Sequence, residues 1–134
     1  WDPFLRLRLR DLRIAHFSYI CKSGYMESNQ AIAALSALAQ SSRLDAFRLL
    51  VQNEPDGLPA GEIARLLVAP QNTVSTHLSI LQNANLVVSE RQGRSIIYRT
   101  QISTLRELML FLAKDCCGGH ETLCAPLVAE LACC

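Results

Sequence analysis

The hydrophobic positions between residues 70 and 98 change period once, from that of a helix to that of a strand. Val74, Leu78 and Leu81 recur at i, i+4 and i+7, which predicts a helix with one buried face behind Pro70, a residue suited to a first helical turn. The opposite face carries hydrogen-bonding side chains with almost no charge: Gln71, Asn72, Thr73, Ser75, Thr76 and His77. An ordinary surface helix would carry Lys and Glu there, whereas these groups suit the base edges of a DNA major groove.

A short β-hairpin is expected directly after that helix. Two β-rich runs, Leu86–Val88 and Ile96–Tyr98, flank Gly93, which can supply a positive φ at the hairpin tip. Arg91 and Arg94 would then project from the tip, within reach of backbone phosphates beside the helix. Taken alone, the two arginines are equally compatible with a solvated turn. Helix and hairpin together predict a winged helix-turn-helix that binds double-stranded DNA.

The remaining apolar periodicity predicts further helices over residues 31–39, 43–52, 62–67 and 103–114. The second of these is expected to place its large apolar side chains on one face: Leu44, Phe47, Leu50 and Val51. The last helix is apolar over more than one face, so it lies either in a core or against a partner chain. The predicted fold class is therefore mainly α with a small β-hairpin, in one DNA-binding and dimerisation domain over residues 26–115.

Composition and charge set limits on this interpretation. A chain of 134 residues that is 50% hydrophobic can form one compact domain. Residues 1–25 carry five basic and two acidic side chains, which leaves −2 for residues 26–134 out of a net charge of +1. The DNA-binding body is thus not a polycation, and its affinity must come from locally placed arginines, dimerisation and helix N-termini.

The first 25 residues differ from the rest of the chain. Leu and Arg alternate over residues 5–10, and Met26 precedes a clean helical start, so we expect residues 1–25 to be a poorly ordered or non-native extension. The chain contains no secretory apolar segment and no run of 18 apolar residues. We therefore expect a cytoplasmic protein without a membrane partner.

Several segments together resemble the ArsR/SmtB family of metal-responsive repressors. They are residues 35–50, Glu62-Ile-Ala64, Thr73-Val-Ser-Thr-His-Leu78 and 86–98 with Gly93-Arg94, within a match of about residues 30–112. The resemblance implies a homodimer, held by its first and last helices, on a palindromic operator. The chain departs from the family at Pro70, where many members place a capping Ser or Asp. It also lacks a cysteine pair on the helix before the turn and the His/Asp set of zinc sensors on 103–114.

Cysteines outside these segments are the candidate ligands. The chain has six, of which four form adjacent pairs: Cys21, Cys116, Cys117, Cys124, Cys133 and Cys134. In a cytosolic protein this pattern indicates metal binding or redox chemistry rather than structural disulfides, and neighbouring cysteines rarely bridge each other. The tail over residues 116–134 contains Gly118-Gly119, which can turn the chain so that Cys124 returns towards Cys116 and Cys117.

Three thiolates without a carboxylate suit a soft, three-coordinate ion, and trivalent arsenic or antimony fits that description. Some members of the resembled family hold an arsenical on C-terminal cysteines. Zinc, cadmium or another thiophilic metal is the alternative. For zinc, His120 lies four residues before Cys124 and could complete a tetrahedral site with the three cysteines. A thiol redox switch, or buried cysteines without a ligand, also remains open. Cys133 and Cys134 could bind a second ion or lie in a flexible end, and Cys21 is given no role.

The sequence offers no enzyme chemistry. It contains no Cys-x-x-Cys, no Gly-rich phosphate-binding turn and no His in a triad-like context. The prediction is therefore an arsenite-responsive repressor, whose dimer leaves operator DNA when trivalent arsenic binds Cys116, Cys117 and Cys124.

Overall fold

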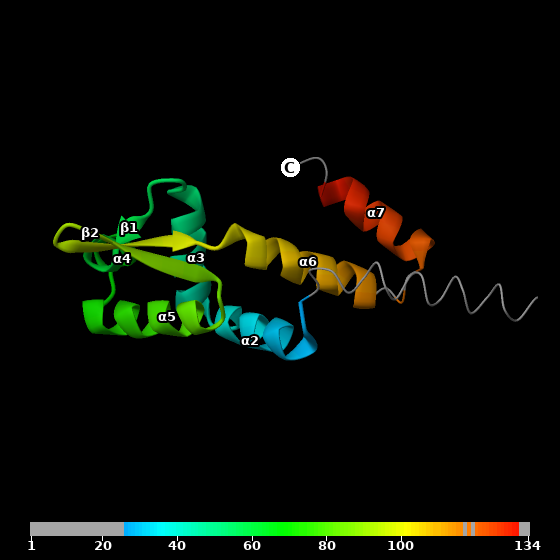
Figure 1. Ribbon diagram of the computed structural model, residues 1–134, viewed down its shortest axis with the longest axis horizontal. Helices are drawn as coiled ribbons and strands as arrows, with labels where there is room; N and C mark the ends of the chain where they lie inside the picture. Colours follow the sequence, from blue (N-terminus) through cyan, green and yellow to red (C-terminus); the bar gives the residue numbers. More distant parts are fainter. Residues whose placement is uncertain (1–25, 117, 119, 132–134) are drawn as a thin grey trace, which may run out of the picture.

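The computed structural model describes residues 26–116, 118 and 120–131, without the side chains of residues 115, 116, 128 and 131. The extension predicted at residues 1–25 lies outside the described residues, as do Cys117, Cys133 and Cys134. The elements follow in this order (Figure 1): α2 Ser28–Leu38, α3 Ser41–Gln52, β1 Leu58–Pro59, α4 Ala60–Leu67, α5 Gln71–Asn83, β2 Val87–Gln92, β3 Ser95–Thr100, α6 Ile102–Cys116 and α7 Glu121–Leu131. No helix in these ranges is long and apolar enough to cross a membrane.

The core lies where α2, α3, α4 and α5 meet the sheet. Helix α5 buries Val74, Leu78 and Leu81, as its periodicity predicts. Helix α2 contributes three small side chains to the core, which lets it approach closely: Ala31, Ala34 and Ala37. The expected apolar face of α3 is only partly right, because its buried stripe is Ala46, Phe47 and Leu50. Leu44 and Val51 flank that stripe and are each 40% exposed.

The hairpin forms as predicted and gains a third strand. Strands β2 and β3 pair antiparallel from Val87↔Thr100 to Gln92↔Ser95, which leaves a two-residue turn in which Gly93 has φ +62°. A type of turn that needs positive φ explains a glycine at this position. Strand β1 pairs with β3 through Leu58↔Tyr98. Two residues are too short a run to show any period, so β1 was not predicted.

Helix α6 lies between α2 and α7 and extends away from the sheet (Figure 1). It buries Leu108, while Met109 and Leu110 are 41% and 42% exposed. Its outward apolar side chains therefore do not lie in this chain's own core. The tail predicted over residues 116–134 contains a further helix, α7, with Pro126 inside it.

Two charged side chains form hydrogen bonds that connect neighbouring elements. Arg43 Nε donates to Ala37 O at 2.6 Å, which satisfies a carbonyl at the end of α2. Glu54 Oε1, in the turn after α3, accepts from the backbone N–H of Thr100 at 2.7 Å and from its hydroxyl at 2.6 Å. Thr100 is the last residue of β3 and is 7% exposed. The carboxylate thus holds the joint between the hairpin and α6.

Candidate functional site

Helices α4 and α5 form a helix-turn-helix around a tight connection. Helix α4 ends at Leu67 and is capped by Val68, which has a left-handed backbone with φ +51°. The N–H of Val68 donates to Arg65 O at 3.3 Å and that of Ala69 to Ala64 O at 3.0 Å, so the last carbonyls of α4 are satisfied. Pro70 immediately precedes α5, which begins at Gln71. Proline stands one residue earlier than predicted, and it still costs the helix no hydrogen bond.

The outward face of α5 presents polar groups, as expected. Gln71, Asn72, Thr73 and Thr76 are exposed, and Ser75 is half-buried. The Thr76 hydroxyl donates to Asn72 O at 3.0 Å. Because a hydroxyl has one hydrogen and two lone pairs, Thr76 can then only accept from a ligand. This face combines amide groups that both donate and accept with a hydroxyl that accepts, which is the kind of set that distinguishes base pairs in a major groove.

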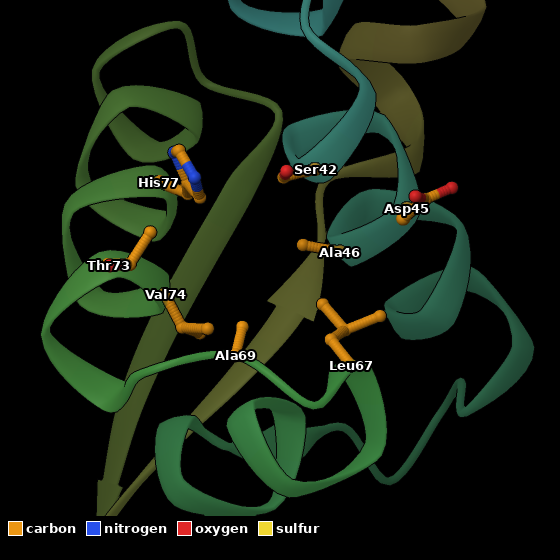
Figure 2. A pocket seen from close by; sticks show the side chains of 8 residues that line it. All are labelled: Ser42, Asp45, Ala46, Leu67, Ala69, Thr73, Val74 and His77. Carbon is orange, nitrogen blue, oxygen red and sulfur yellow. The ribbon is translucent and has the colours of Figure 1, made fainter.

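His77 differs from the rest of the predicted polar face. It lies three residues after Val74 and four before Leu81, so it borders the buried stripe of α5 (Figure 2). Its Nδ1 is buried without a hydrogen-bond partner among the described residues. A cavity of about 100 Å³ lies there between α3, the turn and α5, lined by Ser42, Asp45, Ala46, Leu67, Ala69, Thr73, Val74 and His77. His77 was predicted on the polar face opposite the buried stripe, whereas the structure half-buries it beside that stripe. A DNA contact by this residue stays a prediction.

The hairpin tip carries the two predicted arginines in exposed positions. Arg91 Nε donates to Gly93 O at 3.3 Å, and Arg94 follows that glycine in the turn. Figure 1 shows the hairpin tip, the N-terminus of α5 and the α4–α5 turn at the same end of the molecule. One surface therefore combines the uncharged face of α5 with two guanidinium groups. Such a surface can place cations on phosphates on one side of a groove that α5 enters.

A side-chain bridge holds the hairpin against α5. Gln82 Nε2, near the end of α5, donates to Ser89 Oγ of β2 at 2.8 Å. Further along, Arg99 pairs with Glu90 at 2.6 Å, so its charge is partly compensated within the sheet. Neither Gln82 nor Ser89 was predicted from the sequence. Their pairing depends on how the hairpin folds back on the helix, and each alone is an ordinary solvated polar residue.

One ion pair lies on α4 beside the turn. Arg65 Nε donates to Glu62 Oε2 at 2.9 Å. This hydrogen bond lowers the pKa of the Glu62 carboxyl and raises the pKa of the Arg65 guanidinium. The two charges largely cancel, so α4 adds little net positive charge to this end of the molecule.

The predicted thiol site is described in part. Cys124 lies on α7, and its Sγ donates to Ala113 O of α6 at 3.1 Å. Cys116 is the last residue of α6, one turn beyond Ala113. The chain after α6 therefore does turn back, as the two glycines suggested, and brings Cys124 to the final turn of α6. Among the side chains that the structure describes, no three His, Cys, Asp or Glu residues gather as a metal site, but those of Cys116 and Cys117 are not in that set.

His120 marks the start of α7. Its carbonyl oxygen accepts from the N–H groups of Leu123 at 3.1 Å and Cys124 at 3.2 Å. The imidazole is exposed and begins one helical turn before the Cys124 thiol. His120 thus lies on the same helical turn as Cys124, and its role as a fourth zinc ligand stays a prediction.

Similarity to known proteins agrees with this geometry. Residues 38–90 match the family described as helix-turn-helix domain. The HTH-type transcriptional regulator NmtR of Mycobacterium tuberculosis is 36% identical over 80 residues, 60% of this chain and 64% of that protein. The chain thus matches less than two thirds of that regulator's length.

Solved structures give the same assignment. An ArsR-like transcriptional regulator from Rhodococcus sp. RHA1 is 25% identical, with a TM-score of 0.58 over 78% of this chain and 89% of that one. The homodimeric winged helix-turn-helix DNA-binding domain of a possible ArsR-family regulator from Mycobacterium bovis is 26% identical, with a TM-score of 0.52 over 69% and 85%. The predicted winged helix-turn-helix fold is confirmed. Element order, hairpin geometry and similarity agree: residues 38–90 match a helix-turn-helix domain, and the chain is similar to ArsR-like winged helix-turn-helix transcriptional regulators.

Proposed function

We propose that this protein is a homodimeric repressor that binds operator DNA and leaves it when trivalent arsenic binds its C-terminal cysteines. One observation supports the proposed DNA binding: the polar face of α5 and the arginines at the hairpin tip lie at the same end of the molecule (Figure 1). In the proposed complex α5 enters the major groove, Gln71, Asn72, Thr73, Ser75 and Thr76 face the bases, and Arg91 and Arg94 bind phosphates.

Dimerisation uses apolar side chains that the fold leaves outside. Ile32 and Leu35 on α2 are 63% and 41% exposed, and Met109 and Leu110 on α6 are exposed to a similar degree. The two helices are neighbours in the structure. A second copy packed on them would bury this apolar surface and place the two α5 helices about 34 Å apart, one turn of DNA. The homodimeric state of the similar Mycobacterium bovis domain supports a homodimer.

Soft thiol donors support arsenic as the inducer. Each As–S bond forms when a thiol replaces one hydroxyl of arsenous acid, and the thiol proton leaves with that hydroxyl as water. The Cys124 thiol donates to Ala113 O in the last turn of α6, the helix that ends at Cys116. Three thiols with no carboxylate complete a three-coordinate set without a competing hard ligand.

Arsenic binding would also remove a contact of the ligand-free protein. The Cys124 thiol donates its proton to Ala113 O, at the C-terminal end of α6. A sulfur bonded to arsenic has no proton to donate, so the α6–α7 contact must change when the site fills. A change worth about 1–3 kcal/mol in the dimer would weaken operator binding 5- to 150-fold.

A zinc or cadmium response is the second candidate, because His120 starts one helical turn before Cys124 and could supply a fourth ligand. In that case the three cysteines and His120 would surround a tetrahedral ion. A thiol redox switch would use the same cysteines without any ion.

The test is a DNA-binding titration by fluorescence anisotropy, on a duplex selected from a random-sequence pool with the full chain. Arsenite should weaken binding of the wild type and of the control Cys21→Ser, but not of Cys116→Ser, Cys117→Ser or Cys124→Ser. Release by arsenite in all five proteins would place the site elsewhere. Release by zinc alone, lost in His120→Ala, would favour the second candidate, and release by oxidant reversed by a reductant would favour the switch.

A further inference from the structure

Val68, in the turn between α4 and α5, combines two properties that proteins usually avoid. The residue is 92% exposed, although its side chain is apolar. Its backbone is left-handed, with φ +51°, a conformation that crowds a β-branched side chain. Glycine closes helices in this conformation without strain. The fold therefore gains nothing from the isopropyl group.

The surrounding turn explains why Val68 stays in this conformation. Its own N–H and that of Ala69 donate to α4 carbonyls at 3.3 and 3.0 Å. Leu67 and Ala69, on either side of it, are half-buried and line the cavity against α3 and α5 (Figure 2). The backbone is thus fixed from both sides, while the Val68 side chain between them points to solvent. Strain held in place this way often marks a functional position.

The position of the turn identifies what the side chain can meet. Val68 lies three residues before Gln71, the first residue of α5. The turn, the N-terminus of α5 and the hairpin tip share one end of the molecule (Figure 1), the end that faces DNA in the proposed complex. A DNA groove offers apolar surface at thymine 5-methyl groups and at the C–H edges of deoxyribose.

We propose that Val68 is a DNA-contact residue, whose isopropyl group packs on the apolar surface of the duplex beside the bases that α5 faces. This inference rests on the proposed DNA binding by α5 and does not depend on the inducer. The contact explains why a strained, exposed valine occupies a turn for which glycine is suited. It also adds affinity without charge, which suits a body with net charge −2 over residues 26–134.

The decisive variant is Val68→Gly, in which folding and binding should move in opposite directions. Release of the left-handed strain should raise Tm by about 2–5 °C at fixed protein concentration. Loss of the isopropyl contact should weaken operator binding about fivefold for each half-site, and about 25-fold for a dimer. The matched control is Asn85→Gly. Asn85 is exposed and left-handed with φ +57°, at the other end of α5, so its substitution should leave operator affinity unchanged.

Thymine-to-deoxyuridine substitution along the selected duplex separates the two sources of apolar surface. If Val68 packs on a methyl group, one substitution weakens binding by the wild type and has no effect on Val68→Gly. If it packs on deoxyribose, Val68→Gly weakens binding to every duplex equally, and each thymine substitution affects the wild type and Val68→Gly alike. Either result supports the contact. Unchanged affinity of a stabilised Val68→Gly protein overturns this inference and leaves the proposed function intact, whereas a wild-type protein that selects no duplex overturns both.

Discussion

Removal of the Glu54 carboxylate should destabilise the protein far more than removal of an exposed carboxylate. Glu54 Oε1 accepts from both the N–H and the hydroxyl of Thr100, at 2.7 and 2.6 Å. Thr100 is buried, so neither donor can turn to bulk water when the acceptor is lost. Hydrogen bonds to a charged group contribute about 1.5–3 kcal/mol each. Because Glu54 itself is half-buried, we expect Glu54→Ala to lose about 3 kcal/mol in total.

Graded variants apportion this loss between the two hydrogen bonds. Glu54→Gln keeps a neutral acceptor and should lose about 1 kcal/mol, and Thr100→Val, which keeps only the backbone donor, about 1.5 kcal/mol. The double variant Glu54→Ala/Thr100→Val should lose clearly less than the sum of its two single variants, since both remove the same contact. The control is Glu107→Ala on the exposed surface of α6, expected to change stability by less than about 0.5 kcal/mol.

Urea unfolding at one protein concentration is the suitable assay, because the stability of a dimer depends on concentration. With a slope of about 2 kcal/mol per molar urea, Glu54→Ala should lower the midpoint by about 1.5 M. A midpoint within experimental error of the Glu107→Ala protein would refute the structural role of this carboxylate. Strict additivity in the double variant would show that Glu54 and Thr100 act independently.

Three further predictions concern α5 and the hairpin, each measured by anisotropy on the selected duplex. Gln82→Ala should weaken binding several-fold with little change in Tm, because it removes the hydrogen bond between α5 and the hairpin without disturbing the core. An unchanged affinity would show that the hydrogen bond to Ser89 is dispensable. Arg94→Ala should weaken binding to all sequences alike and reduce the slope of log K against log salt by about 1 per subunit; a change in sequence preference would contradict a phosphate contact. His77→Ala should lower Tm but weaken operator binding much less than Asn72→Ala, because the His77 ring borders the core; the reverse order would place His77 at the bases.

Local periodicity was sufficient to predict the DNA-binding half of the fold. Val74, Leu78 and Leu81 repeat at helical spacing, and the structure buries all three. Gly93 marks the hairpin tip because the turn needs a positive φ, which few other residues supply. In both cases the determining interactions lie within a few residues of each other, so one segment contains the whole signal.

The features that the sequence did not reveal depend on distant contacts. Glu54 and Thr100 are 46 residues apart, and nothing near either one indicates the partner. Strand β1 exists only because β3 lies beside it. The departure of His77 has a different cause: helical spacing gives the buried stripe correctly, but which flank meets a neighbour depends on where α3 packs.

Helix α6 connects the two halves of the proposed mechanism. In its C-terminal turn, Ala113 O accepts a hydrogen bond from the Cys124 thiol. Its N-terminus closely follows Thr100, which donates to the Glu54 carboxylate. Leu86, the residue before β2, accepts at its carbonyl oxygen from the Gln101 N–H at 2.8 Å. Both ends of the hairpin are therefore hydrogen-bonded next to the start of α6. A helix of 15 residues spans about 22 Å and transmits a tilt from one end to the other with little bending. A change at the cysteines therefore has a rigid path to the base of the hairpin, whereas its path to the recognition face of α5 passes through the packed core. Arsenic binding is accordingly expected to act first on the position of Arg91 and Arg94 relative to the phosphates, and loss of the salt-dependent part of operator affinity is the form that release should take.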